Sequence, residues 1–77
     1  MTATSNRVTH FEERAEVVIK EFSDMNMGSR LMSMGILPGS LITIERIAPM
    51  KGGYCLKTAS GQKLALRYRE ADSIIVE

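Results

Sequence analysis

Side chains that could take part in chemistry are few in this sequence. It has one cysteine, Cys55, and one histidine, His10, which lie far apart along the 77 residues. A metal site needs three or four converging ligands, and nucleophilic or acid–base catalysis needs a base beside its partner group. The sequence therefore predicts no catalytic residue, no metal site and no cofactor, and we do not expect an enzyme. Cys55 is interpreted as a small hydrophobic residue and His10 as a surface residue.

Four methionines lie close together, namely Met25, Met27, Met32 and Met34. Thioethers are soft ligands that suit Cu(I), but methionine also fills irregular gaps in small cores. Helical spacing places Met27, Leu31 and Met34 on one face, so we interpret these three as core residues. Exposed Met32, beside Leu37, is then a candidate docking patch.

The stretch from Met50 to Arg69 contains five basic residues and no acidic one. These residues are Lys51, Lys57, Lys63, Arg67 and Arg69. Lys63 and Arg67 have the spacing of residues on one face of a strand, so we expect a locally positive surface. This surface is either a solvated face or a site for an acidic partner, whose opposite potential would raise the association rate.

The composition indicates one small folded domain. Hydrophobic residues make up 44% of the chain and charged residues 25%, as in ordinary globular proteins. The formal net charge of +1 argues against general nucleic-acid binding, which depends on many unbalanced basic contacts. No apolar run approaches the ~20 residues that span a bilayer, and no segment resembles a signal peptide. We expect a cytoplasmic chain with a frayed segment over residues 1–14 and one domain over residues 15–77.

The first half of that domain predicts a strand followed by a short helix. Apolar and polar residues alternate over residues 16–22, which favours a strand, and the helical spacing covers residues 27–34. Gly35 can take a positive φ and so end the helix, which would fold Ile36 back onto Leu31. Pro38 and Gly39 then predict a tight turn.

The rest of the chain is expected to be β. Four stretches rich in β-branched or alternating apolar residues predict strands over residues 41–48, 54–58, 62–68 and 73–77. A brief turn is expected over residues 69–72. Together these elements predict a mainly β fold with five antiparallel strands and one short helix inserted after the first strand. Such a sheet manages its exposed edges by curling into a partly open barrel.

Two stretches of the sequence resemble the ferrous iron transport protein A (FeoA) family. The first runs from Arg30-Leu31 through Met34-Gly35-Ile36 to Pro38-Gly39, and the second is Leu64-Ala65-Leu66-Arg67 followed by Glu70-Ala71, Ile74 and Val76. Between them, Ala48-Pro49 stands where the family has a proline after its second strand. The resemblance covers residues 15–77, and its motifs occur in the family's order and spacing.

The resemblance implies an SH3-like barrel that works beside FeoB, the membrane transporter for ferrous iron. The implied role is that of a non-catalytic accessory protein, monomeric or weakly dimeric, that docks on the transporter's cytosolic GTP-binding domain or its membrane part. The candidate partner-binding residues are Arg30, Met32, Leu37, Lys63, Arg67 and Arg69, and the candidate structural turn comprises Gly35, Pro38 and Gly39. Two alternatives stay open: a small barrel that binds RNA or a peptide, and a detached SH3-like domain of a metal-dependent regulator.

Overall fold

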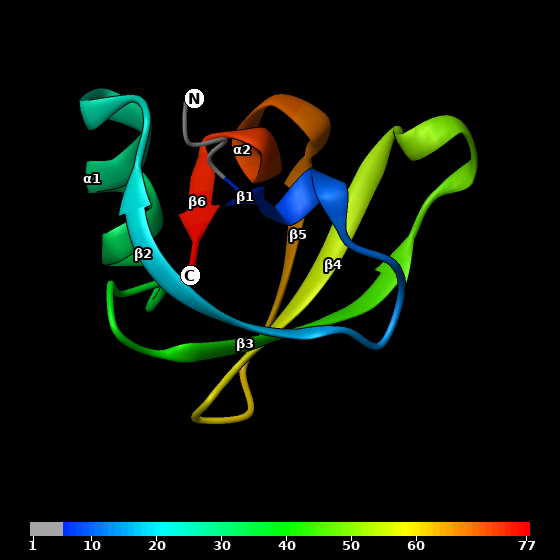
Figure 1. Ribbon diagram of the computed structural model, residues 1–77, viewed down its shortest axis with the longest axis horizontal. Helices are drawn as coiled ribbons and strands as arrows, with labels where there is room; N and C mark the ends of the chain where they lie inside the picture. Colours follow the sequence, from blue (N-terminus) through cyan, green and yellow to red (C-terminus); the bar gives the residue numbers. More distant parts are fainter. Residues whose placement is uncertain (1–5) are drawn as a thin grey trace, which may run out of the picture.

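Residues 6–77 form a single curled antiparallel sheet with two helices in the computed structural model (Figure 1). The sheet order is β1-β6-β2-β3-β4-β5. The strands are β1 (Asn6–Arg7), β2 (Glu16–Phe22), β3 (Leu41–Ile47), β4 (Gly53–Thr58), β5 (Lys63–Arg67) and β6 (Ile74–Val76). The helices are α1 (Met25–Ser33) and α2 (Tyr68–Asp72), with short 3-10 turns η1 (Val8–His10) and η2 (Pro49–Lys51).

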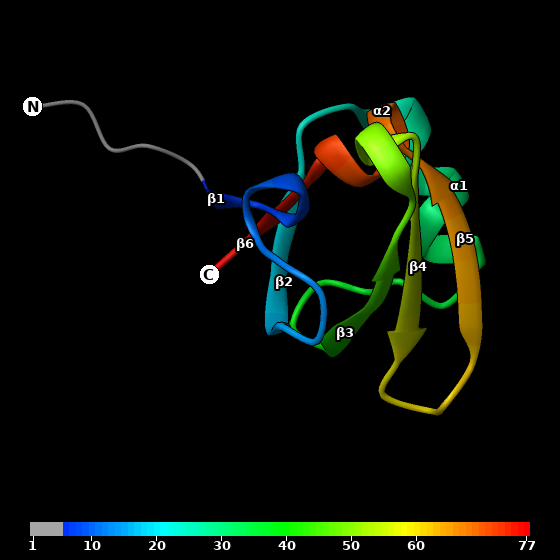
Figure 2. The same ribbon diagram turned by 90° about the vertical axis from the view of Figure 1, so that its right-hand side faces the viewer.

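Strand β2 makes the sheet curl. Its first half pairs with β3, and its second half pairs with β6 after a register shift between Ile19 and Glu21. A second shift lies in β3 between Ile44 and Arg46. Extra residues of this kind bend a strand and increase its twist, so the sheet wraps around its own apolar face (Figure 2). The predicted fold class, a mainly β SH3-like barrel, is confirmed.

The core follows the alternation seen in the sequence. Val17 and Ile19 of β2, and Ile42 and Ile44 of β3, are buried, as the pattern predicts. They pack with the inner side chains of the other elements, which are Val8, Leu31, Ile36, Tyr54, Leu56, Leu66, Ala71, Ile74 and Val76. One connected core of this size serves residues 6–77.

Helix α1 begins and ends at strong local signals. The Asp24 side chain accepts a hydrogen bond from the Met27 backbone N–H at 3.0 Å, which satisfies one of the free donors of the first turn. At the other end Gly35 has φ +94°, and the Ile36 N–H donates to the Leu31 carbonyl at 3.0 Å. This pairing is the Schellman motif, and it confirms that Gly35 stops the helix.

The turn after the helix is also confirmed. The Ser40 N–H donates to the Leu37 carbonyl at 3.1 Å, with Pro38 and Gly39 in the middle of the turn. Gly39 has φ +89°, as a type II turn requires of its third residue.

The prediction that residues 1–14 are frayed is wrong from Asn6 onward. Asn6 and Arg7 pair with the C-terminal strand β6, and Val8 is fully buried. Residues 1–5 lie outside the described part of the chain. Strand β1 was hard to predict because a two-residue strand has no periodicity and its partner lies at the other end of the described chain.

The expected turn over residues 69–72 is helix α2, and the strand predicted over residues 62–68 is shorter than expected. Tyr68, expected at the end of that strand, instead begins α2 and is 42% exposed. The Arg67 backbone N–H donates to the Glu70 carboxylate at 2.8 Å, which caps the new helix and ends the strand. The described chain thus has six strands rather than five, and a second helix. No helix of residues 6–77 is long and apolar enough to cross a membrane.

Candidate docking surface

Three of the predicted partner-binding residues meet in one hollow. Arg30 reaches it from α1, Arg67 from the end of β5 and Arg69 from α2. The hollow has a volume of about 450 Å³, and Met27 and Glu70 complete its lining. We call these five residues the arginine cleft.

One carboxylate organises the arginine cleft. Glu70 caps α2 with one oxygen, and its other oxygen lies 3.4 Å from the Arg30 guanidinium. The Glu70 side chain is 20% exposed whereas that of Arg30 is 72% exposed, so the guanidinium still faces solvent. An exposed ion pair of this kind adds at most about 1 kcal/mol to stability. The cleft therefore keeps a positive surplus, because three arginines and a single acidic residue line it.

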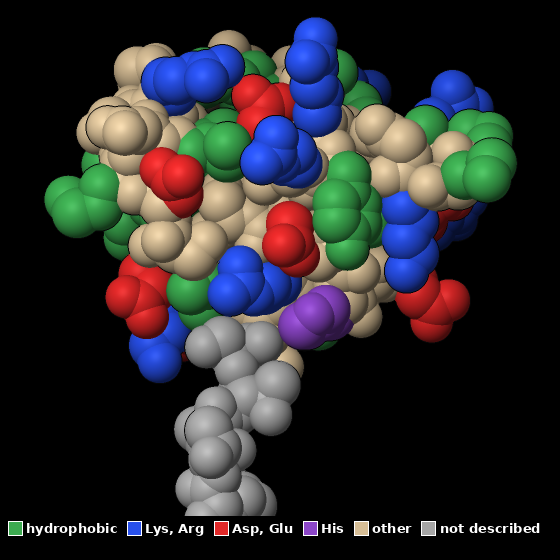
Figure 3. All heavy atoms as spheres, turned by 90° about the horizontal axis from the view of Figure 1, so that it is seen from above, with side chains coloured by type: hydrophobic (Ala, Val, Ile, Leu, Met, Phe, Trp, Pro, Cys, Tyr) green, Lys and Arg blue, Asp and Glu red, His purple; other side chains and the backbone are tan. Residues whose placement is uncertain are grey.

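Lys63 lies at the other end of β5 and is not part of the cleft. Its ammonium lies 3.6 Å from a carboxylate oxygen of Glu45, which reaches across from β3. Residues 50–69 contain no acidic residue, but Glu45 from outside this stretch offsets the charge of Lys63, so the expected locally positive surface is weaker at that position. Figure 3, a view onto the end of the molecule where α2 lies, likewise shows acidic side chains among the basic ones.

Met32 and Leu37 are exposed, as predicted, at 40% and 49%. Met25, one helical heptad before Met32 and on the same face, is 85% exposed. Met27 and Met34 are partly buried and pack against the core, which confirms their interpretation as core residues. Helical geometry places Met25 and Met32 on the side of α1 opposite Met27. Of the candidate residues, Arg30, Arg67 and Arg69 thus share the arginine cleft, and Met32 belongs with Met25 to a separate apolar patch.

The residues that could ligate metal do not converge. No three His, Cys, Asp or Glu side chains of residues 6–77 lie close enough together to hold an ion. His10 belongs to η1, where its Nδ1 accepts a hydrogen bond from the Arg7 N–H at 3.3 Å. Cys55 is half-buried in the outer face of the sheet, beside Ala65 of β5.

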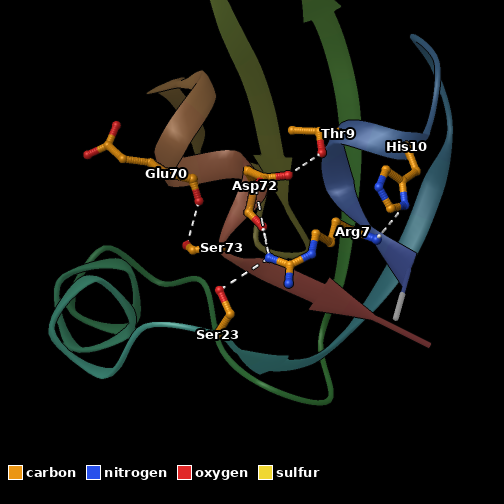
Figure 4. Close-up of polar contacts among 7 residues, drawn as sticks. All are labelled: Arg7, Thr9, His10, Ser23, Glu70, Asp72 and Ser73. Atoms are coloured by element: carbon orange, nitrogen blue, oxygen red, sulfur yellow. Dashed lines mark hydrogen bonds and ion pairs between the residues drawn. The ribbon is translucent and has the colours of Figure 1, made fainter. Parts of the chain in front are cut away.

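A polar network missed at the sequence level ties the N-terminal strand to α2 (Figure 4). The Arg7 guanidinium donates to the Asp72 carbonyl at 2.7 Å, and the Thr9 hydroxyl donates to the Asp72 carboxylate at 2.7 Å. Arg7 also reaches the Ser23 hydroxyl at 3.3 Å. Val8, an isolated apolar residue in a polar stretch, was the one available signal that this segment is ordered. The network fixes α2, and with it one wall of the arginine cleft.

Tyr54 carries the one buried hydroxyl that has no hydrogen-bond partner among residues 6–77. Burial raises the pKa of this phenol above its ordinary value, and the nearby Tyr68 and Asp72 raise it further. The Tyr54 and Tyr68 rings lie 6.3 Å apart and are tilted by 54°. The ring of Tyr54 therefore fills the core beneath α2, and its hydroxyl stays protonated at neutral pH.

Comparison with known proteins gives the same fold and a family. The model of the FeoA domain family matches residues 7–77, nearly the whole chain. The chain belongs to the FeoA family. FeoA membership accounts for both the Met-Gly-Ile and Pro-Gly motifs and the barrel, and it confirms the resemblance seen in the sequence. The matched region also includes Arg7 and Val8, in agreement with an ordered N-terminal strand.

Solved structures of FeoA proteins superpose closely on this chain. A FeoA-like protein from Clostridium acetobutylicum is 30% identical, with a TM-score of 0.84 over 99% of this chain and 88% of that one. Stenotrophomonas maltophilia FeoA, an SH3 domain protein complexed with zinc, is 18% identical, with a TM-score of 0.81 over 95% and 91%. A manganese-dependent transcriptional repressor shares the fold at 19% identity and a TM-score of 0.85, over 99% of this chain and 37% of the repressor. No curated protein matches this chain in sequence.

Proposed function

We propose that this FeoA protein is a non-catalytic accessory protein of ferrous iron uptake that docks from the cytoplasm on a FeoB-type transporter. The FeoA family is implicated in ferrous iron transport, and one structural relative is an iron(II) transport protein A from Clostridium thermocellum, 29% identical to this chain. The observation that carries the proposal is the convergence of Arg30, Arg67 and Arg69, from three separate elements, in the arginine cleft.

The chemistry of the cleft favours an acidic protein surface. Guanidinium groups bind carboxylates with two parallel hydrogen bonds, and a positive hollow steers an acidic partner toward it. Met27 adds an apolar, adaptable wall to the same hollow. Such a surface combines long-range electrostatic attraction by the arginines with short-range apolar contact by Met27, as a transient regulatory complex requires.

The alternatives from the sequence gain no specific support. Binding of single-stranded RNA needs exposed aromatic rings on a strand face. Of the four aromatic residues Tyr54 is buried, Phe11 and Phe22 pack against the core, and Tyr68 alone is 42% exposed. The likeness to the manganese-dependent repressor lies below 25% identity and concerns the fold alone, so it does not favour a detached regulator domain.

The test is a binding titration against the transporter's purified cytosolic GTP-binding domain, with and without nucleotide, at two salt concentrations. Reversing the charge of Arg67 and Arg69 together should lower the association rate, and the loss should shrink at high salt because exposed charges are screened beyond ~10 Å at 0.1 M. If Met32→Asp instead raises the dissociation rate with little salt dependence, the apolar patch is the contact. Absence of binding by the wild-type chain in every condition would refute docking on this domain.

A further inference from the structure

Strand β5 is the last strand of the sheet and has a free edge. It pairs with β4 on one side, and the sheet order places no strand of residues 6–77 on its other side. The Thr58 N–H donates to the Gln62 carbonyl at 2.8 Å, so Thr58 and Gln62 form a hydrogen-bonded pair of the β4–β5 hairpin. Because bonded and unbonded positions alternate in antiparallel pairs, Leu64 and Leu66 bond to β4. The backbone groups of Lys63, Ala65 and Arg67 therefore point away from it.

The Arg67 amide confirms this orientation. Its N–H donates to the Glu70 carboxylate rather than to β4. The N–H and C=O groups of Lys63 and Ala65 make no backbone hydrogen bond beyond the sheet in the described chain. An edge strand with such unpaired groups is a template for another extended chain.

Helix α1 approaches both ends of this edge. Figure 2 shows α1 and β5 toward one side of the molecule and β6 toward the other. The arginine cleft joins the two elements at the Arg67 end of β5, and the Gln62 side chain lies beside Gly35 at the opposite end. Between them Met27, Met34 and Leu64 are partly buried and pack on the core. The edge of β5 thus offers free hydrogen-bonding groups beside partly buried apolar side chains, and it has a cationic end at the arginine cleft.

The outer face of β5 adds a second apolar contact. Ala65 lies beside Cys55 of β4, and both line a shallow hollow of about 210 Å³ together with Ala48. Lys63 and Arg67 flank Ala65 at two residues on either side and are exposed. Along this face a small apolar residue therefore lies between two basic residues.

We propose that an extended acidic segment of the partner protein adds to the free edge of β5 as a further strand. Its backbone pairs with Lys63 and Ala65. One side chain of the segment covers Ala65 and Cys55, and acidic side chains two residues to either side face Lys63 and Arg67. The side chains between these point to the face of the sheet that carries Leu64, which is partly buried against the core. The segment that fits is acidic, then three apolar residues, then acidic, with the stronger charge contact at the arginine cleft because Glu45 already neutralises Lys63. The proposal rests on the proposed function only for the partner's identity, which is a cytosolic segment of the transporter.

The site is tested directly with a short capped peptide whose core is Glu-Leu-Val-Leu-Glu, flanked by Gly and Ser. In an NMR titration of the isotope-labelled chain, the peptide should shift the amide signals of β5 and α1 and slow the hydrogen exchange of the Lys63 and Ala65 amides. The same peptide with Lys in place of Glu should bind at least about tenfold more weakly, a difference of ~1.4 kcal/mol. Absence of binding, or binding without slower exchange at Ala65, would overturn strand addition.

Two substitutions at one position separate the backbone contact from the side chain. Ala65→Pro removes the outward N–H, and proline is tolerated on an edge strand whose N–H faces solvent. We expect about tenfold weaker peptide binding from the lost hydrogen bond. Ala65→Val keeps the N–H and should bind within about threefold of wild type, because the change adds only apolar surface. Equal affinity of the Pro and Val variants would contradict the proposal, and the wild-type exchange measurement decides it even if the Pro variant does not fold.

The partner's identity is tested separately with peptides that tile the transporter's cytosolic segments. A tile that slows exchange at Ala65 supports strand addition and identifies the segment. Binding of the designed peptide alone leaves strand addition standing and removes the transporter as its source. Binding of the transporter's cytosolic domain with unchanged exchange at Ala65 overturns strand addition but leaves the docking proposal intact.

Discussion

Replacing Gly39 by valine should destabilise the protein through backbone strain alone. Gly39 has φ +89°, and a side chain placed there would meet nothing within 4 Å. There is thus no steric clash to confuse the measurement. A non-glycine residue in a sparsely populated backbone region costs about 1–3 kcal/mol, and a β-branched residue belongs at the upper end. Restricting the unfolded chain returns roughly 0.4–1 kcal/mol.

The net loss for Gly39→Val is therefore about 2–2.6 kcal/mol. A loss of 1 kcal/mol lowers the melting temperature of a domain of this size by roughly 4–8 °C. Gly52→Ala is the matched control, since Gly52 has φ −73° and a side chain there makes only ordinary contact at 3.6 Å. Calorimetry should show a lower melting temperature for Gly39→Val and an unchanged or slightly higher one for Gly52→Ala. Equal melting temperatures for Gly39→Val and wild type would refute the assignment of this turn.

Three further predictions concern stability. Gly28→Ala should lower the free energy of unfolding in urea by about 1 kcal/mol, because the added Cβ would lie 2.9 Å from Phe22 Cβ. This overpacking outweighs the better helix propensity of alanine. A gain in stability would show that α1 can move. Asp24→Ala should cost ~1 kcal/mol through loss of the helix cap, and Asp24→Asn should restore most of it. Tyr54→Phe should leave stability at pH 7 unchanged or raise it by up to about 1 kcal/mol, since it removes a buried unpaired hydroxyl. The pKa of Tyr54 is raised in the folded state, so the protonated phenol favours folding. Its contribution to the free energy of unfolding is complete below the unfolded pKa of ~10 and is lost as the pH rises through the folded pKa. The wild type should therefore lose stability in that pH range, and the variant should not.

Elements with local signals could be predicted from the sequence. The end of α1 was predictable because Gly35, Ile36 and the turn at Gly39 act within a few residues of one another. The central strands were predictable because one buried face imposes a period of two. These signals need no knowledge of the rest of the fold.

Features that depend on long-range pairing were not predictable in the same way. The pairing of Asn6 with Val76 joins the two ends of the described chain. The contact of Glu45 with Lys63 depends on the strand order and on a register shift that no local pattern reveals. The arginine cleft likewise requires α1 to lie beside the end of β5, so the sequence could nominate its arginines but could not bring them together.

The central claim is that the arginine cleft docks this FeoA protein on a FeoB-type transporter. The most direct measurement is co-purification of the chain with the full-length transporter from detergent-solubilised membranes at low salt. The wild type should be retained, and Arg67→Glu with Arg69→Glu should be lost. A control with the same net charge, Arg14→Glu with Lys51→Glu, changes exposed residues outside the cleft and should be retained. Retention of the cleft variant at the wild-type level, or no retention of the wild type, would contradict the claim.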